Sequence, residues 1–324
     1  MNRPRSPRRA TVPSPTDGLL ALAAGELRLT LAPGVGGSIA SFTRRWREGG
    51  AERKLHWLRP ASEEGLAARN PLAMASFPLL PFCNRIRNGR ASFEGRDIRF
   101  PPNHPAEDSP HPLHGIGWQR PWTVESATAT QAVLALQVEA TEAWPWAFSA
   151  RQVFTLDAEQ LTVEMTLANE DHVTMPAGIG HHPYFPHHPG TRITSPTRAM
   201  WQADAEVLPT GLDSGGPVPL LRAGVELAAL DLDNNFIGWE RITRIDWPAD
   251  AQGLARSLHM EAAPPLDYFV LYCPRGYPFF CAEPVSQCTD WLNLAGKYDA
   301  QALGGTRIAP REALGARFSL RPVI

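Results

Sequence analysis

The chain has 324 residues, of which 43% are hydrophobic and 20% are charged, a balance typical of a globular protein with a sizeable core. Its net charge is −2, and because residues 1–16 contain four arginines and no acidic residue, the rest of the chain is mildly acidic. Such a body has no electrostatic preference for nucleic acid or anionic lipid, and no segment approaches the roughly 20 apolar residues that span a bilayer. We therefore expect neither nucleic acid nor a membrane as a partner.

The first segment, residues 1–16, is predicted to be a disordered tail. It is rich in Arg, Pro, Ser and Thr and cannot bury enough apolar surface to offset its ordering entropy. It lacks the apolar stretch of a secretory signal, although its Arg and Ser content leaves an organelle transit peptide as an alternative. Residues 17–324 show no internal linker, and large β domains often exceed about 200 residues, so we expect a single domain there. Nothing in the sequence predicts an oligomeric state.

Within that domain the dominant pattern is the period of two that is typical of strands. One short helix is predicted within residues 62–69. Strand-like runs follow at 132–138, 152–156, 161–168, 267–272 and 317–320. Residues 157–160 are the predicted turn of a hairpin, and many of the 32 prolines and 26 glycines separate the other runs. The sequence therefore predicts a mostly β, antiparallel architecture, a sandwich of long sheets with few short helices.

The cysteines indicate a reducing compartment. Cys83, Cys273, Cys281 and Cys288 show no paired spacing and are too few to build a chain of this size from disulfides. We expect reduced, buried thiols and a cytoplasmic location.

Three polar motifs stand in predicted loops and could bind a ligand. They contain Asn84 with Arg85, His114 before a glycine, and Asp233 before two asparagines. The planar fork of a guanidinium and the oxygens of a carboxylate suit neighbouring hydroxyl groups, as a sugar presents them. Taken singly, each motif is more often a loop cap or a surface ion pair.

The run Gly-His-His-Pro-Tyr-Phe at residues 180–185 offers a proton donor. Consecutive His181 and His182 on a strand would point to opposite faces, so only one of them can enter a given pocket. Together with His187 and His188 they could instead bind a metal. Two prolines interrupt this stretch, however, and no carboxylate or thiolate lies within it, so we predict no metal.

A proton acceptor is offered about a hundred residues later by Glu283, which follows an apolar run and precedes a proline. A carboxylate there is costly if it is buried without a partner, whereas a glutamate at a strand end is commonly solvated. Histidine and glutamate have unperturbed pKa values of roughly 6.5 and 4.3, so near neutral pH one can donate a proton while the other accepts one. Such a pair would support acid–base catalysis without a cofactor.

Taken in order, these segments resemble the aldose 1-epimerase (galactose mutarotase) family, from about residue 27 to the C-terminus. The motifs that carry the resemblance are Asn-Arg-Ile at 84–86, Leu-His-Gly at 113–115, the run at 180–185, Leu-Pro-Thr-Gly at 208–211, Asp-Asn-Asn-Phe at 233–236, and Glu-Pro at 283–284 with Asn293 downstream.

The resemblance implies an antiparallel β-supersandwich of the galactose mutarotase type, with an open sugar cleft. His182, immediately before Pro-Tyr-Phe, matches the family's histidine that protonates the ring oxygen, and Glu283 matches the base that takes the proton of the anomeric hydroxyl. The residues that hold the substrate in this family match Arg85, His114 and Asp233, and Asn84 is a further candidate. The implied activity is the interconversion of the α and β anomers of a monosaccharide, with no cofactor.

The substrate is less firmly indicated, because the better-studied branch has Asn-His-Ser/Thr-Tyr-Phe-Asn where this chain has Gly-His-His-Pro-Tyr-Phe-Pro. A sister branch acts on hexose 6-phosphates and would need cations near the cleft, for which Arg87, Arg90 and Arg96 are candidates. Three tryptophans could stack on a sugar's apolar face, although most of the ten are expected in the core. They are Trp118, Trp239 and Trp291.

Two other functions are compatible with the residues. A non-catalytic carbohydrate-binding or sensor protein could use the same fold, since a fold does not guarantee an activity. It would have no need of both proton-transfer residues. A glycoside-processing enzyme could use Asp233 and Glu283 as paired carboxylates, but the histidine would then have no role.

Overall fold

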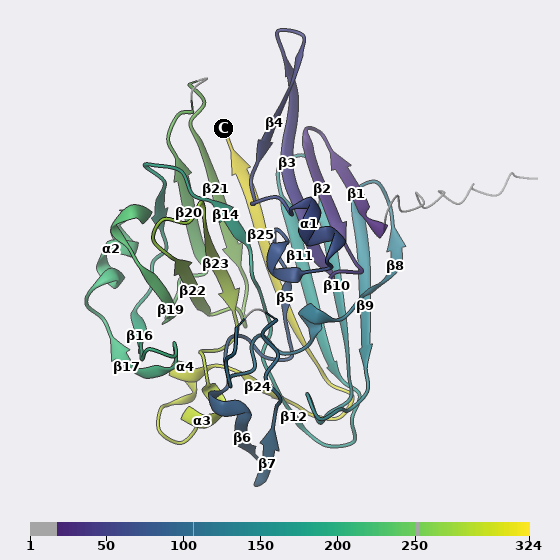
Figure 1. The fold of residues 1–324 in the computed structure, drawn as a ribbon, viewed down its shortest axis with the longest axis vertical. Helices are drawn as coiled ribbons and strands as arrows, with labels where there is room; N and C mark the ends of the chain where they lie inside the picture. Colours follow the sequence, from purple (N-terminus) through teal and green to yellow (C-terminus); the bar gives the residue numbers. More distant parts are fainter. Residues whose placement is uncertain (1–17, 106, 251–252) are drawn as a thin grey trace, which may run out of the picture.

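The computed structural model describes residues 18–105, 107–250 and 253–324, so the tail predicted at residues 1–16 lies outside the described residues. In these ranges the strands pair into antiparallel sheets and the helices are short (Figure 1). The predicted mostly β, antiparallel class is confirmed. No helix in the described part of the chain is long and apolar enough to cross a membrane.

Two large sheets dominate the described residues, and smaller sheets flank them (Figure 1). The nine-stranded sheet has the order β18 (Val225–Glu226), β15 (Arg192–Thr194), β20 (Ile242–Trp247), β21 (Arg256–Ala262), β25 (Ala313–Val323), β11 (Leu161–Asn169), β10 (Phe148–Leu156), β9 (Gln131–Val138) and β8 (Thr123–Ala127). The eight-stranded sheet has the order β17 (Pro209–Asp213), β16 (Ala199–Ala203), β19 (Leu232–Ile237), β22 (Tyr268–Cys273), β23 (Phe279–Val285), β13 (Gly180–His181) and β5 (Pro78–Leu79), and β14 (Tyr184–Pro186) also pairs with β23.

The remaining elements are shorter or peripheral. The N-terminal sheet consists of β1 (Leu20–Ala24), β2 (Leu27–Ala32), β3 (Ser38–Glu48) and β4 (Ala51–His56). Two ribbons are formed by β6 (Arg90–Phe93) with β7 (Arg96–Arg99) and by β12 (Met175–Ala177) with β24 (Thr306–Ile308). The helices are α1 (Glu63–Ala67), α2 (Pro217–Ala223), α3 (Trp291–Leu294) and α4 (Ala300–Leu303), with 3₁₀ turns η2 (Pro71–Ala73), η3 (Arg87–Gly89), η4 (Gly117–Gln119) and η5 (Leu227–Ala229).

Local sequence signals account for the elements that were predicted. The turn between β10 and β11 is fixed by Asp157, whose Oδ1 accepts hydrogen bonds from the N–H groups of Glu159 and Gln160. Helix α1 begins after Ser62, whose side chain accepts the N–H of Gly65. The other predicted runs fall in β9, β22 and β25. These elements confirm the predicted hairpin and the predicted short helix.

A buried polar chain connects the sheets through His181. Its Nδ1 contacts the hydroxyl of Ser76, and its Nε2 lies 3.3 Å from Oε1 of Gln152 on β10. The amide of Gln152 donates in turn to the carbonyl of Gly37, 3.0 Å away, and the His181 ring packs 5.3 Å from that of Phe318 on β25. His181 therefore belongs to the core between the two large sheets.

The direction of these hydrogen bonds fixes which ring nitrogen of His181 carries the proton. Because the Gln152 amide nitrogen donates to Gly37, its oxygen must accept, so Nε2 of His181 carries the proton and Nδ1 accepts from Ser76. Burial, with a smaller effect of neighbouring His182, lowers the pKa of His181 to about 3, which keeps the ring neutral. Every member of the chain is then satisfied.

Removing the hydrogen bonds of Gln152, at the centre of this buried polar series, should destabilise the fold. We expect Gln152→Leu to lower the free energy of unfolding by about 2–4 kcal/mol, because it leaves the Nε2–H of His181 and the carbonyl of Gly37 buried without partners. Urea unfolding followed by circular dichroism measures the change. The matched control is Gln131→Leu on neighbouring β9, whose bond to Thr155 is exposed and whose loss should cost at most about 0.5 kcal/mol. Equal effects of the two substitutions would contradict this account.

Candidate active site

A cleft of about 330 Å³ lies over the eight-stranded sheet and the loops beside it, and its lining includes all six residues that the sequence analysis assigned to proton transfer or to holding a sugar. These are Asn84, Arg85, His114, His182, Asp233 and Glu283. Their convergence from five separate segments is a property of the fold, whereas their individual roles remain predictions.

Strand register explains how the sheet presents its part of the cleft. Asp233 on β19 pairs with Tyr272 on β22, and Glu283 on β23 pairs with Val270 on β22. Because alternate residues of a strand share a face, Asp233, Tyr272 and Glu283 all project from the same side of three adjacent strands. All three line the cleft.

The same register places His182 beside Glu283. On one side of His182, Gly180 pairs with Val285 of β23, and on the other side Tyr184 pairs with Cys281. His182 therefore lies opposite Glu283, between the two stretches of pairing. The register question left open by the sequence is answered, because His181 enters the core and His182 enters the cleft.

His182 and Glu283 form a buried pair. Nε2 of His182 lies 3.3 Å from Oε1 of Glu283, and the two residues are only 7% and 2% exposed. Nδ1 of His182 and Oε2 of Glu283 are buried and have no hydrogen-bond partner among the described residues. Buried polar atoms are normally satisfied, so this pair is the kind of exception that a ligand would complete.

Burial shifts both groups toward their neutral forms. It lowers the pKa of His182 to about 3, with the charge of Arg59 acting in the same direction. It also raises the pKa of Glu283 well above its usual value, to which the negative charge of Asp233 adds while Arg85 opposes. Ordinary pKa values would place the shared proton on the imidazole, whereas burial favours its location on the carboxyl group.

A reciprocal backbone contact orients His114. The N–H of Asn84 donates to Nδ1 of His114 at 3.1 Å, and the N–H of His114 donates to the carbonyl of Asn84 at 2.9 Å. Both residues have positive φ angles, 58° and 59°. Burial, followed by the charges of His182 and Arg85, lowers the pKa of His114 and keeps it neutral. Since Nδ1 accepts, Nε2 carries the proton and is available as a donor.

Arg85 and Asp233 form a second polar pair. Nη1 of Arg85 lies 3.7 Å from Oδ2 of Asp233 and also donates to Oδ1 of Asn84 at 3.3 Å. Burial raises the pKa of Asp233, while the charge of Arg85 lowers it. The pair combines a fork of donors with carboxylate acceptors, which suits neighbouring hydroxyl groups.

The sequence analysis did not select Arg59 or the two aromatic rings that it contacts, those of Tyr184 and Phe279. The Arg59 guanidinium carbon lies 3.7 Å from the ring centroid of Tyr184 and 4.8 Å from that of Phe279, and its Nη2 donates to the carbonyls of Leu72 and Met74. Tyr184 stood within the recognised run, but the segment around Arg59 carries no motif that could have indicated its position. The tryptophans considered for sugar stacking, Trp118, Trp239 and Trp291, are instead buried in the core.

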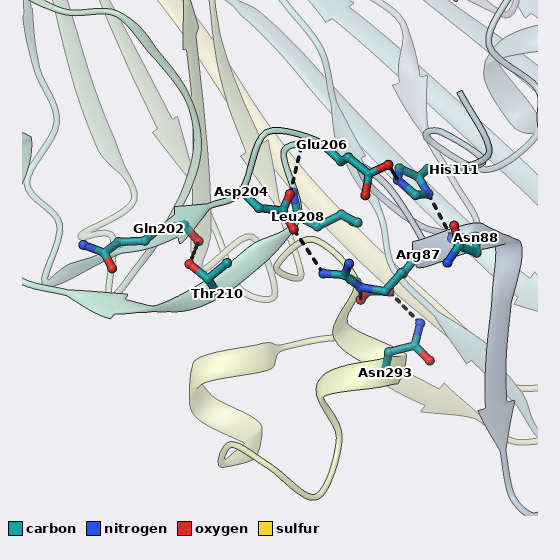
Figure 2. Close-up of polar contacts among 10 residues, drawn as sticks. Arg87, Asn88, His111, Gln202, Asp204, Glu206, Leu208, Thr210 and Asn293 are labelled. Atoms are coloured by element: carbon teal, nitrogen blue, oxygen red, sulfur yellow. Dashed lines mark hydrogen bonds and ion pairs between the residues drawn. The ribbon is translucent and has the colours of Figure 1, made fainter. Parts of the chain in front are cut away.

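The arginines considered for phosphate binding are used elsewhere. Figure 2 shows Arg87 reaching toward Asp204, with Nη2 and Oδ2 3.5 Å apart. Its backbone N–H donates to Asp290, which also accepts from Asn293. Arg96 lies over the ring of Trp146, and Arg90 begins β6. These three arginines lie outside the cleft lining, which corrects the idea that they serve a phosphate there.

Two contacts therefore tie the loop that follows Arg85 to the turn between β16 and β17 (Figure 2). One is the ion pair of Arg87 with Asp204, and Oδ1 of Asp204 accepts the N–H of Leu208 at 3.0 Å. The other runs through His111, which accepts the N–H of Asn88 at 2.9 Å and lies 3.5 Å from Glu206. This framework holds the loop that carries Asn84 and Arg85.

The histidines considered as a metal site do not come together as one group. His181 lies in the core and His182 in the cleft, while the backbone N–H of His187 bonds to the carbonyl of Pro278. The donor atoms that do converge belong to His182, Cys281 and Glu283, and lie within 4.8 Å of one another. All four cysteines are free and buried.

Comparison with known proteins identifies the family of the chain. The family model for aldose 1-epimerase matches residues 19–300. The uncharacterized protein YphB of Escherichia coli K12 is 32% identical over 315 residues, which cover 93% of this chain and 97% of that protein.

Solved structures extend the likeness to the fold. A candidate aldose 1-epimerase from Escherichia coli K12 superposes with a TM-score of 0.80 and 28% identity, covering 94% of this chain and 98% of that one. A galactose 1-epimerase from Lactobacillus acidophilus NCFM gives a TM-score of 0.71 at 15% identity, with 94% of each chain covered. The predicted galactose mutarotase-like supersandwich is thereby confirmed, and the chain belongs to the aldose 1-epimerase family.

Proposed function

We propose that this protein is a mutarotase, an isomerase that interconverts the α and β anomers of an unphosphorylated aldose by acid–base ring opening. The observation that carries the proposal is the buried contact of His182 with Glu283 at the cleft, where each side chain retains one unpartnered polar atom among the described residues. No cofactor is required, because the reaction only moves protons and breaks and reforms one C–O bond within the sugar.

The proposed reaction depends on which member of the pair, His182 or Glu283, carries their shared proton. In the assignment implied by the family, Glu283 removes the proton of the anomeric hydroxyl while His182 protonates the ring oxygen. The bond between the anomeric carbon and the ring oxygen then breaks and leaves an open aldehyde. Rotation about the adjacent C–C bond and reclosure give the other anomer. Ring closure reverses both proton transfers, so the shared proton returns from Glu283 to His182.

The neutral pair favoured by burial has the charge state that ring opening produces, with a protonated carboxyl group and a neutral imidazole. Opening starts from the imidazolium–carboxylate form, and closure starts from the neutral form. The protein therefore need not gain or lose a proton during turnover. Each positioned acid or base typically contributes about 10²- to 10⁴-fold in rate.

The other cleft residues would hold the sugar. Arg85 with Asp233, and the Nε2–H of His114, offer donors and acceptors to its hydroxyl groups. The partly exposed ring of Phe279 offers a surface for its apolar face. Positioning of this kind supplies much of the advantage of an enzyme over free acid and base.

The alternatives have less support. The arginines considered for a hexose 6-phosphate lie outside the cleft lining, and Arg59, which does line it, donates to the carbonyls of Leu72 and Met74, so an unphosphorylated sugar is favoured. A non-catalytic binder would have no use for a costly buried His–Glu pair. A glycosidase that used Asp233 and Glu283 as its paired carboxylates would leave the buried His182 without a role. A cytoplasmic location remains part of the proposal and is consistent with the free cysteines.

Polarimetry tests the activity directly. With fresh α-glucose or α-galactose, the protein should accelerate the approach to anomeric equilibrium, and Glu283→Gln or His182→Asn should reduce that rate at least about 100-fold. Glu159→Gln in the β10–β11 turn and His172→Asn, which is 91% exposed, are the matched controls and should keep the rate. Unchanged rates across a panel of free and phosphorylated aldoses, with sugar binding retained, would identify a binder instead.

The pH profile should reflect the shifted pKa values. The pair is active with one proton, and it gains a second only as the pH approaches the His182 pKa of about 3. We therefore expect the rate, corrected for spontaneous mutarotation, to persist at about pH 5, below the ordinary histidine value of about 6.5. It should fall at higher pH, as the raised pKa of Glu283 is passed and the single proton is lost. An acid limb centred near the ordinary histidine value would contradict this arrangement.

Glu283 should also reduce stability. A pKa raised in the folded state contributes stability below the unfolded value, which is lost as the pH rises through the folded value. Glu283→Gln removes this dependence, so it should raise the free energy of unfolding relative to wild type by more at pH 8 than at pH 4. Urea unfolding at both pH values measures the difference. A destabilised variant at pH 8 would count against a buried, costly carboxyl group, and Glu159→Gln provides the baseline.

A further inference from the structure

The donor set at the base of the cleft includes a thiol that the acid–base reaction does not use. Cys281 lies two residues before Glu283 on β23, so both side chains project from the same face of the strand. The pairing of Tyr184 with Cys281, continued to Gly180 with Val285, brings His182 to this face as well. One nitrogen, one sulfur and one carboxylate oxygen thus lie within 4.8 Å of one another.

These atoms match what a zinc ion requires. Zinc binds imidazole nitrogen, thiolate sulfur and carboxylate oxygen at about 2.0–2.3 Å in tetrahedral geometry, which places its ligands about 3.3–3.8 Å apart. The 3.3 Å contact between His182 and Glu283 already has this separation, and small side-chain rotations would bring in Cys281. Catalytic zinc sites commonly have three protein ligands and one open position.

A second observation points to a ligand at the same place. Oε2 of Glu283 is buried without a hydrogen-bond partner in the described part of the chain, on a residue that is 2% exposed. Cys281 is completely buried. A sugar accounts for the unpartnered carboxyl oxygen, but it gives no reason for a thiol beside it.

We propose that His182, Cys281 and Glu283 form an inhibitory site for Zn²⁺, which competes with the sugar. The ion would occupy the imidazole and the carboxylate that move protons, and its fourth position would face the cleft. Zn²⁺ is therefore an inhibitor here and not a cofactor. The binding site stands on geometry alone, whereas the inhibitory consequence rests on the proposed mutarotase function.

Direct titration tests the binding site without reference to activity. Chelator-treated protein is titrated with Zn²⁺ by calorimetry, and with Cd²⁺ while the ultraviolet charge-transfer band of a cadmium thiolate is followed. Cys281→Ala should weaken Zn²⁺ binding at least about tenfold and abolish the Cd²⁺ band. Cys273→Ala, which removes a buried thiol from neighbouring β22, is the matched control and should change neither. His182→Asn supplies a second ligand deletion should Cys281→Ala not fold.

Inhibition is measured separately. Zn²⁺ should suppress mutarotation by the wild type, with chelator restoring it and excess sugar opposing it, while Cys281→Ala should need at least about tenfold more Zn²⁺. Full activity of the Zn²⁺-loaded wild type, or equally tight binding by Cys281→Ala, would overturn the proposal. Failure of the metal-free enzyme to accelerate mutarotation would overturn the proposed function alone, because calorimetry would still report on the site.

Discussion

The site depends on one constraint, the burial of an acid and a base against each other on the face of an antiparallel sheet. Water would stabilise the charged form of each group separately. The protein excludes water from the pair, so the two groups interact with each other across 3.3 Å instead. The pair then responds as one unit with one proton. On the proposed function, a sugar that enters the cleft would shift this charge state, because Nδ1 of His182 and Oε2 of Glu283 have no other partner among the described residues.

Strand alternation makes this arrangement depend on a single residue of register. His181 and His182 are neighbours in sequence, yet one completes a hydrogen-bonded chain between the sheets and the other faces the cleft. A shift of the segment by one residue would exchange them, placing the cleft histidine in the core and breaking the chain to Gln152. The core chain through His181 thus fixes the register on which the position of His182 depends. The stability of the core and the geometry of the cleft are thus coupled at adjacent residues.

The sequence indicated the local elements and six of the residues that line the cleft, but not their electrostatics. The β10–β11 hairpin and helix α1 were predictable because Asp157 and Ser62 act on their own neighbours. Strand β4 carries exposed charged residues without alternation and is held by pairing with β3, where Arg45 and Glu52 lie 3.3 Å apart. Such a strand is defined by tertiary contacts rather than by its own pattern.

Arg59 and the location of the shared proton illustrate the same limit. Arg59 reaches the cleft only because the carbonyls of Leu72 and Met74 and the ring of Tyr184 hold its guanidinium there. Likewise, unperturbed pKa values describe His182 and Glu283 in water, whereas desolvation is the largest cause of the shift in each. A sequence motif can indicate which residue has a role, but the burial of that residue depends on many contacts with residues that are distant in the sequence.

On the proposed function, the opposing charges around the pair would keep burial from simply inactivating it. Asp233 disfavours a carboxylate at Glu283 while Arg85 favours it, and Arg85 and Asp233 are themselves only 3.7 Å apart. A sugar that bonds to both would change how strongly each acts on Glu283. Substrate binding would then help to move the proton from the carboxyl group to the imidazole, converting the neutral pair into the form that opens the ring. The residues that hold the sugar would thus also adjust the acid and base that act on it.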